Sequence, residues 1–142
     1  MKRFLMLMLL TLGIENLVLA GTPFADHGNQ TMTDLATGLM WDQRETTTMT
    51  WTAALSYCES LNHGGQTDWR LPNRNELESL VDDSIFSAPT INTTYFPGAV
   101  WFRYWSSTTD LKRTYAVFIV DFGYGDVNFN SKTNNNYVRC VR

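Results

Sequence analysis

Two cysteines, Cys58 and Cys140, lie 82 residues apart and are the only cysteines of this 142-residue chain. In an exported protein, an even number of cysteines indicates a disulfide. Such a bridge would tie the middle of the chain to its C-terminal end. In the chain-entropy description, closing a ring of this size stabilises the folded state by about 4 kcal/mol. The alternative is two free thiols, so the prediction depends on whether the chain is exported.

The first twenty residues have the layout of a secretory signal peptide. Lys2 and Arg3 precede an apolar run over residues 4–12, and the segment ends in the small residue Ala20. The run is shorter than the roughly 20 residues of a membrane-spanning helix. We therefore expect cleavage after Ala20, and a secreted, periplasmic or cell-surface protein that does not span the membrane. The alternative is an uncleaved helix or a membrane anchor.

The charge of the remaining chain excludes some partners. Without residues 1–20 it carries 9 basic and 13 acidic residues, a net charge of −4. Such a chain is not expected to bind nucleic acid or an anionic membrane, because it gains little from releasing their counterions. About 120 residues suffice for one domain with a modest core. We read residues 21–30 as an N-terminal extension and residues 31–142 as that domain.

Two amphipathic helices are predicted in the first half of the chain. The first covers residues 51–62 and ends at Gly64 and Gly65, which would act as a C-terminal cap. Its apolar face carries Trp51, Ala54, Leu55, Cys58 and Leu61. The second begins after Asn73, because Glu76 follows at the spacing of a capping box.

Strands are predicted on both sides of the helices. A hairpin joins residues 31–34 to 39–41 through a turn at Gly38. A loop over residues 82–98 follows the helices. The last third is strand-rich, with strands predicted over 100–108, 115–122, 127–130 and 137–141. This order indicates an α+β domain in which helices pack on antiparallel strands, with the disulfide joining the first helix to the last strand.

Several sequence strings resemble one known family. They are residues 33–41 (TDLATGLMW), 67–77 (TDWRLPNRNEL), 104–108 (YWSST) and 137–142 (YVRCVR). Over residues 31–142 the chain resembles the Lcl C-terminal domain family. The resemblance implies a C-type-lectin-like fold with a disulfide from its first helix to its last strand. It also implies binding, because the family is named for a collagen-like bacterial surface adhesin whose terminal domain binds glycosaminoglycans.

This chain departs from that adhesin in two respects. It has no collagen-like stalk, and its net charge of −4 does not suit a sulfated polyanion unless its basic residues gather. The residues that would have to gather are Arg103, Lys112, Arg113 and Lys132.

No metal, cofactor or catalytic site is expected. Residues 71–73 (LPN) and 105–107 (WSS) are the nearest matches to the calcium motifs of sugar-binding C-type lectins, but they lack the carboxylates that calcium needs. His27 and His63 are isolated from other metal ligands. The sequence shows no nucleophile elbow and no paired-carboxylate signature. We therefore expect a non-enzymatic protein. The less favoured alternative is an enzyme of the kind that generates formylglycine, which shares the broader fold class but needs reactive cysteines.

The tryptophans are predicted to lie mostly in the core rather than to form a sugar-stacking platform. They are Trp41, Trp51, Trp69, Trp101 and Trp105. Trp101 is the expected exception, together with the Tyr104 side of its strand, because this segment follows the long loop.

An Asn-rich segment carries the main functional signal. Residues 128–136 contain five Asn in nine positions, and Asn and Tyr make adaptable contacts in binding surfaces. Such segments resemble the variable regions that diversity-generating retroelements rewrite. In the strand from Val127, alternation predicts Val127 and Phe129 in the core and Asn128 and Asn130 outside. The alternative is a solvated strand face with ordinary turns.

We therefore predict one exposed patch that binds a glycan or a surface protein without calcium. Its residues are Arg103, Tyr104, Asp110, Lys112, Arg113, Tyr124, Asn128, Asn130, Asn134, Asn135 and Asn136. Tyr104 and Tyr124 are predicted as its aromatic anchors. The function indicated is adhesin-like recognition. The alternative is a structural or assembly subunit of the cell envelope, whose same face is buried against another copy or a partner, so the sequence leaves oligomerisation open.

Overall fold

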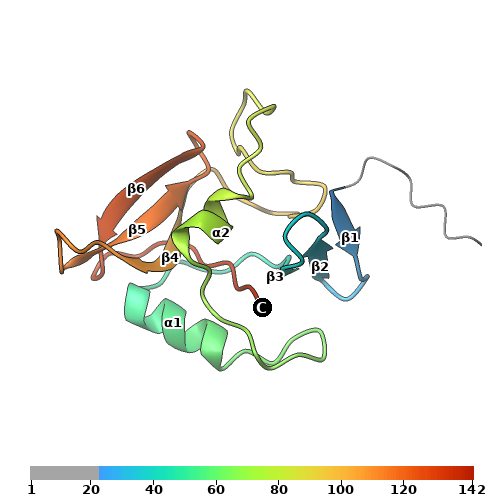
Figure 1. The fold of residues 1–142 in the computed structure, drawn as a ribbon, viewed down its shortest axis with the longest axis horizontal. Helices are drawn as coiled ribbons and strands as arrows, with labels where there is room; N and C mark the ends of the chain where they lie inside the picture. The colour runs from blue at the N-terminus through green and yellow to red at the C-terminus, as the bar shows by residue number, and fades with distance from the viewer. Residues whose placement is uncertain (1–22) are drawn as a thin grey trace, which may run out of the picture.

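The computed structural model describes residues 23–142, which form two three-stranded antiparallel sheets and two helices (Figure 1). The predicted α+β class is confirmed, whereas the predicted signal peptide lies outside the described residues. The elements are β1 Phe24–Asp26, β2 Thr31–Asp34, β3 Met40–Asp42, α1 Trp51–Glu59, α2 Arg74–Glu78, β4 Arg103–Thr109, β5 Ala116–Asp121 and β6 Asp126–Ser131. Within the described part of the chain, no helix is long and apolar enough to cross a membrane.

The smaller sheet has the strand order β1-β2-β3 and contains the predicted hairpin. Thr33 pairs with Met40, and Gly38 in the turn has a φ of 75°, which glycine adopts without strain. Strand β1 comes from the segment predicted as an N-terminal extension, and its Ala25 pairs with Thr33. Part of the chain ahead of residue 31 therefore belongs to the folded domain.

The larger sheet has the order β4-β5-β6, and both of its faces are largely covered. Tyr104 and Val120, paired across β4 and β5, join Leu77 of α2 in one core cluster. Their neighbours Trp105 and Ile119 join the buried residues of α1 in a second cluster. Because side chains alternate along a strand, a sheet covered on both faces gives β5 its nearly continuous apolar sequence.

Helix α1 ends three residues earlier than predicted. Ser60 is its C-cap, and residues 63–66 instead form a tight turn in which Gly64 and Gly65 have positive φ. The indole Nε1 of Trp69 donates to the carbonyl oxygens of His63 (3.1 Å) and Gln66 (3.2 Å). The chain turns here because Trp69 must be buried and its N–H needs a partner.

Helix α2 begins as its sequence predicts. The side chain of Asn73 accepts a hydrogen bond from the backbone N–H of Glu76 (2.9 Å), and the Glu76 carboxylate accepts one from the N–H of Asn73 (2.8 Å). Arg70 donates to both oxygens of Glu76 at 2.8 Å. These bonds, first that with Arg70 and then that with Asn73, hold the pKa of Glu76 below its ordinary value. The helix is short, but its start is closely defined.

The predicted disulfide between Cys58 and Cys140 is present and joins α1 to the C-terminal segment. The strand predicted over residues 137–141 is wrong, because this segment forms only isolated bridges. Val141 pairs with both Trp41 of β3 and Arg70, on two sides. The segment therefore runs between β3 and the segment ahead of α2, and fills the centre of the molecule (Figure 1).

The segment over residues 82–98 contains no helix or strand, as predicted, yet it packs against the core. Ile91 and Phe96 are buried, and the backbone N–H of Thr90 donates to the carbonyl of Phe122 (2.7 Å). This loop leads directly into the residues ahead of β4, and so places them at one end of the larger sheet.

Candidate ligand-binding groove

A groove of about 490 Å³ lies at the end of the larger sheet where β4 begins and β5 ends. Four segments that are distant in sequence line it: the segment ahead of α1, the start of β4, the β5–β6 turn and the C-terminal segment. The lining residues are Thr48, Trp101, Phe102, Arg103, Asp121, Tyr124, Asn135, Asn136 and Tyr137. We call this feature the aromatic groove. Its volume lies in the range of small-ligand sites, about 300–1,000 Å³.

Aromatic side chains give the groove an exposed apolar surface. Trp101 is 57% exposed and Tyr124 is 83% exposed, although both are large and apolar. The ring of Phe102 stacks on Trp101 with 4.5 Å between centroids, and on Tyr137 at 6.1 Å. Tyr137 in turn packs against the buried Tyr104 at 5.5 Å. These four rings thus form a row from the core to the solvent. Their packing fixes the orientation of the two exposed rings of the row, Phe102 and Trp101.

The backbone at Gly123 allows the groove walls to approach each other. A Cβ at this position would lie 2.8 Å from the carbonyl oxygen of Trp101 and 2.9 Å from Oδ1 of Asp121. The N–H of Gly123 donates to the same Oδ1 at 2.8 Å, and the N–H of Phe122 donates to the carbonyl of Phe102 (3.1 Å). Glycine is required here because any larger residue would push the Trp101 segment away from β5.

The polar part of the groove contains one ion pair and one buried amide. Arg103 donates through Nε to Oδ2 of Asp121, across the paired strands, at 3.3 Å. Asn136 is 5% exposed and accepts through Oδ1 from Asn130 (3.2 Å). Its Nδ2 is fully buried and has no hydrogen-bond partner among the described residues. Leaving a buried donor without a partner costs the folded state free energy.

A family model described as the Lcl C-terminal domain matches residues 30–142. The chain belongs to this family. The match spans both helices, strands β2 to β6 and every residue that lines the aromatic groove, and it confirms the predicted family membership. No curated protein matches the chain.

Four of the eleven predicted site residues line the aromatic groove of this Lcl C-terminal domain: Arg103, Tyr124, Asn135 and Asn136. Asp110, Lys112 and Arg113 follow the opposite end of β4. That strand has seven residues, which at about 3.3 Å per residue separates its two ends by about 20 Å. The predicted residues therefore do not form one patch.

The prediction that Tyr104 is an exposed anchor is wrong. Its side chain is 0% exposed, because it lies on the face of β4 that is covered by α2 and the loop after it. Its hydroxyl donates to Oε2 of Glu45 (2.7 Å) and accepts from the N–H of Val100 (3.2 Å). Burial raises the pKa of this phenol, so it remains a donor to Glu45. The buried guanidinium of Arg139 contacts the same Glu45 oxygen at 2.9 Å.

The Asn side chains of β6 bind backbone groups of their own strand. Oδ1 of Asn128 accepts from the N–H of Phe129 (2.8 Å), and Oδ1 of Asn130 accepts from the N–H of Ser131 (2.9 Å). Nδ2 of Asn134 donates to the same Asn130 oxygen at 2.6 Å. Because β6 is the edge strand of the larger sheet, these bonds occupy N–H groups to which a further strand could otherwise pair.

The prediction that Phe129 belongs to the core is also wrong, since its side chain is 41% exposed. Val127, two residues earlier on the same face, packs against the core as predicted. Helix α2 has five residues, too few to extend the covering layer to the end of β6. The guanidinium of Arg113 lies over the Phe129 ring instead, 4.0 Å from its centroid. Asp110 pairs with Arg113 at 2.8 Å, and this bond lowers the pKa of Asp110.

The tryptophans divide as predicted. Trp41, Trp69 and Trp105 are buried and Trp51 is half-buried, whereas Trp101 is exposed in the groove.

The sequence prediction missed four residues that line the groove: Thr48, Phe102, Asp121 and Tyr137. One signal could have found two of these residues: Phe102 follows Trp101 directly, and Asp121 ends an apolar strand just before a turn that contains Gly123.

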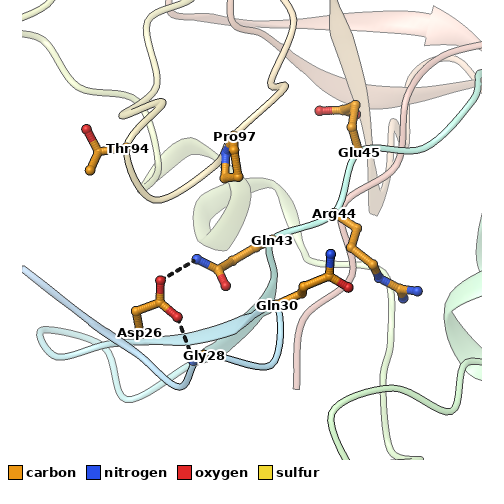
Figure 2. Close-up of a pocket in the computed structure, with 8 residues that line it drawn as sticks. All are labelled: Asp26, Gly28, Gln30, Gln43, Arg44, Glu45, Thr94 and Pro97. Carbon is orange, nitrogen blue, oxygen red and sulfur yellow. Dashed lines mark hydrogen bonds between the residues drawn. The ribbon is translucent and has the colours of Figure 1, made fainter.

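A second hollow, of about 440 Å³, lies between the β1–β2 turn, the segment after β3 and the loop near Thr94 (Figure 2). Its lining residues are Asp26, Gly28, Gln30, Gln43, Arg44, Glu45, Thr94 and Pro97. The buried Gln43 donates through Nε2 to Oδ2 of Asp26 (3.3 Å) and to the carbonyl of Tyr95 (2.9 Å). The N–H of Gly28 donates to Asp26 (2.8 Å) and, together with Gln43, lowers the pKa of Asp26. Several of its polar groups thus bind each other and hold the three segments together.

Metal ligands are not grouped in the described part of the chain. Residues 23–142 hold no cluster of three or more His, Cys, Asp or Glu side chains that could bind a metal ion. Asp121 and Arg103 are the oppositely charged residues of the aromatic groove, and they pair with each other.

Proposed function

We propose that this Lcl C-terminal domain is an exported recognition module that binds its ligand in the aromatic groove. One observation carries the proposal: the exposed aromatic rings of Trp101 and Tyr124 line a groove at the end of the larger sheet. Exposed aromatic side chains in a concave site are typical of binding anchors, because they offer a large contact area at a small entropic cost. The ligand is a glycan or a surface protein.

We also propose that the domain has a C-type-lectin-like fold. Its support is the combination of two helices, two antiparallel sheets and a disulfide from the first helix to the C-terminal segment. The C-terminal residue also pairs with the smaller sheet, because the N–H of Met40 in β3 donates to the carbonyl of Arg142 and the N–H of Arg142 donates back to the carbonyl of Met40.

We assign the domain to an oxidising location, either secreted, periplasmic or at the cell surface. The disulfide supports this location, since such bonds persist in oxidising compartments. We assign no catalytic step to the groove, because its carboxylate is paired with Arg103 and its other lining side chains are aromatic, amide or hydroxyl groups.

Binding by point variants tests the proposal. The oxidised domain is applied to an array of glycans and surface proteins, alongside Trp101→Ala and Tyr124→Ala. Each variant should bind at least about tenfold more weakly, because each loses a stacking surface. Both should keep the melting temperature of the wild type, since neither side chain is buried.

The control is Phe86→Ala, which removes an aromatic ring that is 99% exposed and lies outside the groove. It should bind like the wild type. Unchanged binding by the Trp101 and Tyr124 variants would contradict the proposal. A stable oligomer that buries Trp101 and binds nothing on the array would favour the assembly subunit instead.

A further inference from the structure

We propose that the ligand of the aromatic groove is an uncharged glycan, an inference that rests on the function proposed above. The proposed function leaves the ligand as a glycan or a surface protein, and this inference narrows it to one chemical class. An uncharged glycan differs from the sulfated polyanion that the family resemblance implies. Three properties of the groove carry it: its aromatic faces, its balanced charge and its mixture of donors and acceptors.

The aromatic faces suit sugar rings. Trp101 and Tyr124 are the most exposed of the groove rings, and Phe102 stacks on Trp101 at a 22° interplanar angle, which holds the indole in place. The face of an aromatic ring is electronegative, so it attracts the C–H groups that point from one side of a pyranose ring. Two such faces in a groove of about 490 Å³ would hold a short stretch of a glycan chain.

The charge of the groove is balanced. Arg103 and Asp121 lie 3.3 Å apart and are the two charged residues among the groove's lining side chains. A sulfated or uronic-acid polymer would need a surplus of cations, whereas this pair has no net charge. The other basic residues of the predicted patch, Lys112 and Arg113, follow the far end of β4. An anionic glycan therefore gains no net attraction here.

The hydrogen-bonding groups suit hydroxyls. Among the described residues only Nε of the Arg103 guanidinium is bonded, which leaves its two terminal nitrogens as donors in the groove. The Asp121 carboxylate offers acceptors beside these donors. Adjacent sugar hydroxyls both donate and accept, so they can bind the Arg103 donors and the Asp121 acceptors together. A proline-rich peptide also stacks on aromatic grooves, but it presents mainly carbonyl acceptors and would add few donors to those that Asp121 already has from Arg103 and Gly123.

The test uses matched polysaccharides that differ only in charge. An array carries neutral glucans, galactans and mannans, their sulfated forms, uronic-acid polymers and proline-rich peptides. We expect binding to a neutral glycan, with an affinity that changes less than about twofold between low and high salt, because no counterions are released. The sulfated form of the same glycan should bind no more tightly.

Two variants separate this inference from the function on which it rests. Trp101→Ala should weaken binding about tenfold, and Trp101→Phe, which keeps a ring, should restore part of it. If the strongest ligand is anionic and salt-sensitive, or is a peptide or protein, but still depends on Trp101, the uncharged-glycan inference is overturned and the binding groove stands. If no neutral glycan binds, the inference is overturned as well. If the strongest ligand is insensitive to Trp101→Ala, both claims fail.

Discussion

At the residue scale, exposure separates two tyrosines that the sequence presents as equivalent. Tyr124 is a turn residue and projects into solvent, whereas Tyr104 lies beneath α2 and is fully buried. Strand alternation predicts which residues share a face, but it does not say which face is covered. That depends on where α2 and the loop after it pack, which is a tertiary property.

The buried hydroxyl of Tyr104 gives a prediction that separates structural from binding residues. Tyr104→Phe should destabilise the domain by about 1–3 kcal/mol, because the N–H of Val100 and the carboxylate of Glu45 each lose a buried partner. Its affinity for the ligand should not change. Thermal unfolding and a binding titration of Tyr104→Phe beside Tyr124→Ala measure both properties. A wild-type melting temperature in Tyr104→Phe, or a loss of binding without a loss of stability, would refute this role.

At the scale of helices and strands, structure that depends on neighbouring residues could be predicted from the sequence. Structure that depends on contacts with distant parts of the chain could not. The capping box of α2 joins residues three apart, so its sequence pattern is sufficient. The segment over residues 137–141 resembles a strand, but its pairing with β3 and Arg70 depends on distant parts of the chain. The predicted α1 is too long for a similar reason. The turn after this helix depends on the burial of Trp69, whose indole N–H binds the carbonyl oxygens of the turn.

The start of α2 should depend on pH. The pKa of Glu76 is held below its ordinary value of 4.5 by its bonds with Arg70 and Asn73. Its stabilising contribution is therefore fully present above about pH 4.5 and is lost as the pH falls through the lowered value. Glu76→Gln should be less stable than the wild type by about 1 kcal/mol at pH 7, and this difference should shrink below pH 4.

The matched control is Glu78→Gln on the same helix, whose exposed side chain makes no hydrogen bond or ion pair within the described residues. Denaturant unfolding from pH 7 to pH 3 measures both variants. A Glu76→Gln difference that stays constant over this range, or that Glu78→Gln reproduces, would contradict the role assigned to Glu76.

At the scale of the whole molecule, the α+β class, the disulfide and the family could be predicted from the sequence. The position of the aromatic groove, where we propose that the ligand binds, could be predicted only in part. Arg103 and Arg113 are ten positions apart, but they lie at opposite ends of the larger sheet because β4 runs between them. The Asn-rich segment runs from β6 to the C-terminal segment, which places Asn136 in the groove and leaves Asn128 bonded to its own strand. A surface predicted from residues that are close in sequence is therefore divided between two places on the folded domain.

The central claim, that the aromatic groove and not the far end of the sheet binds the ligand, can be tested on the whole domain. Hydrogen–deuterium exchange is measured for the oxidised protein alone and saturated with the strongest ligand from the array. We predict slower exchange over residues 101–103, 122–125 and 134–137, where the groove segments lie. Residues 110–115 and 128–131 should be unchanged. Protection of these last two segments, with none in the groove, would contradict the account.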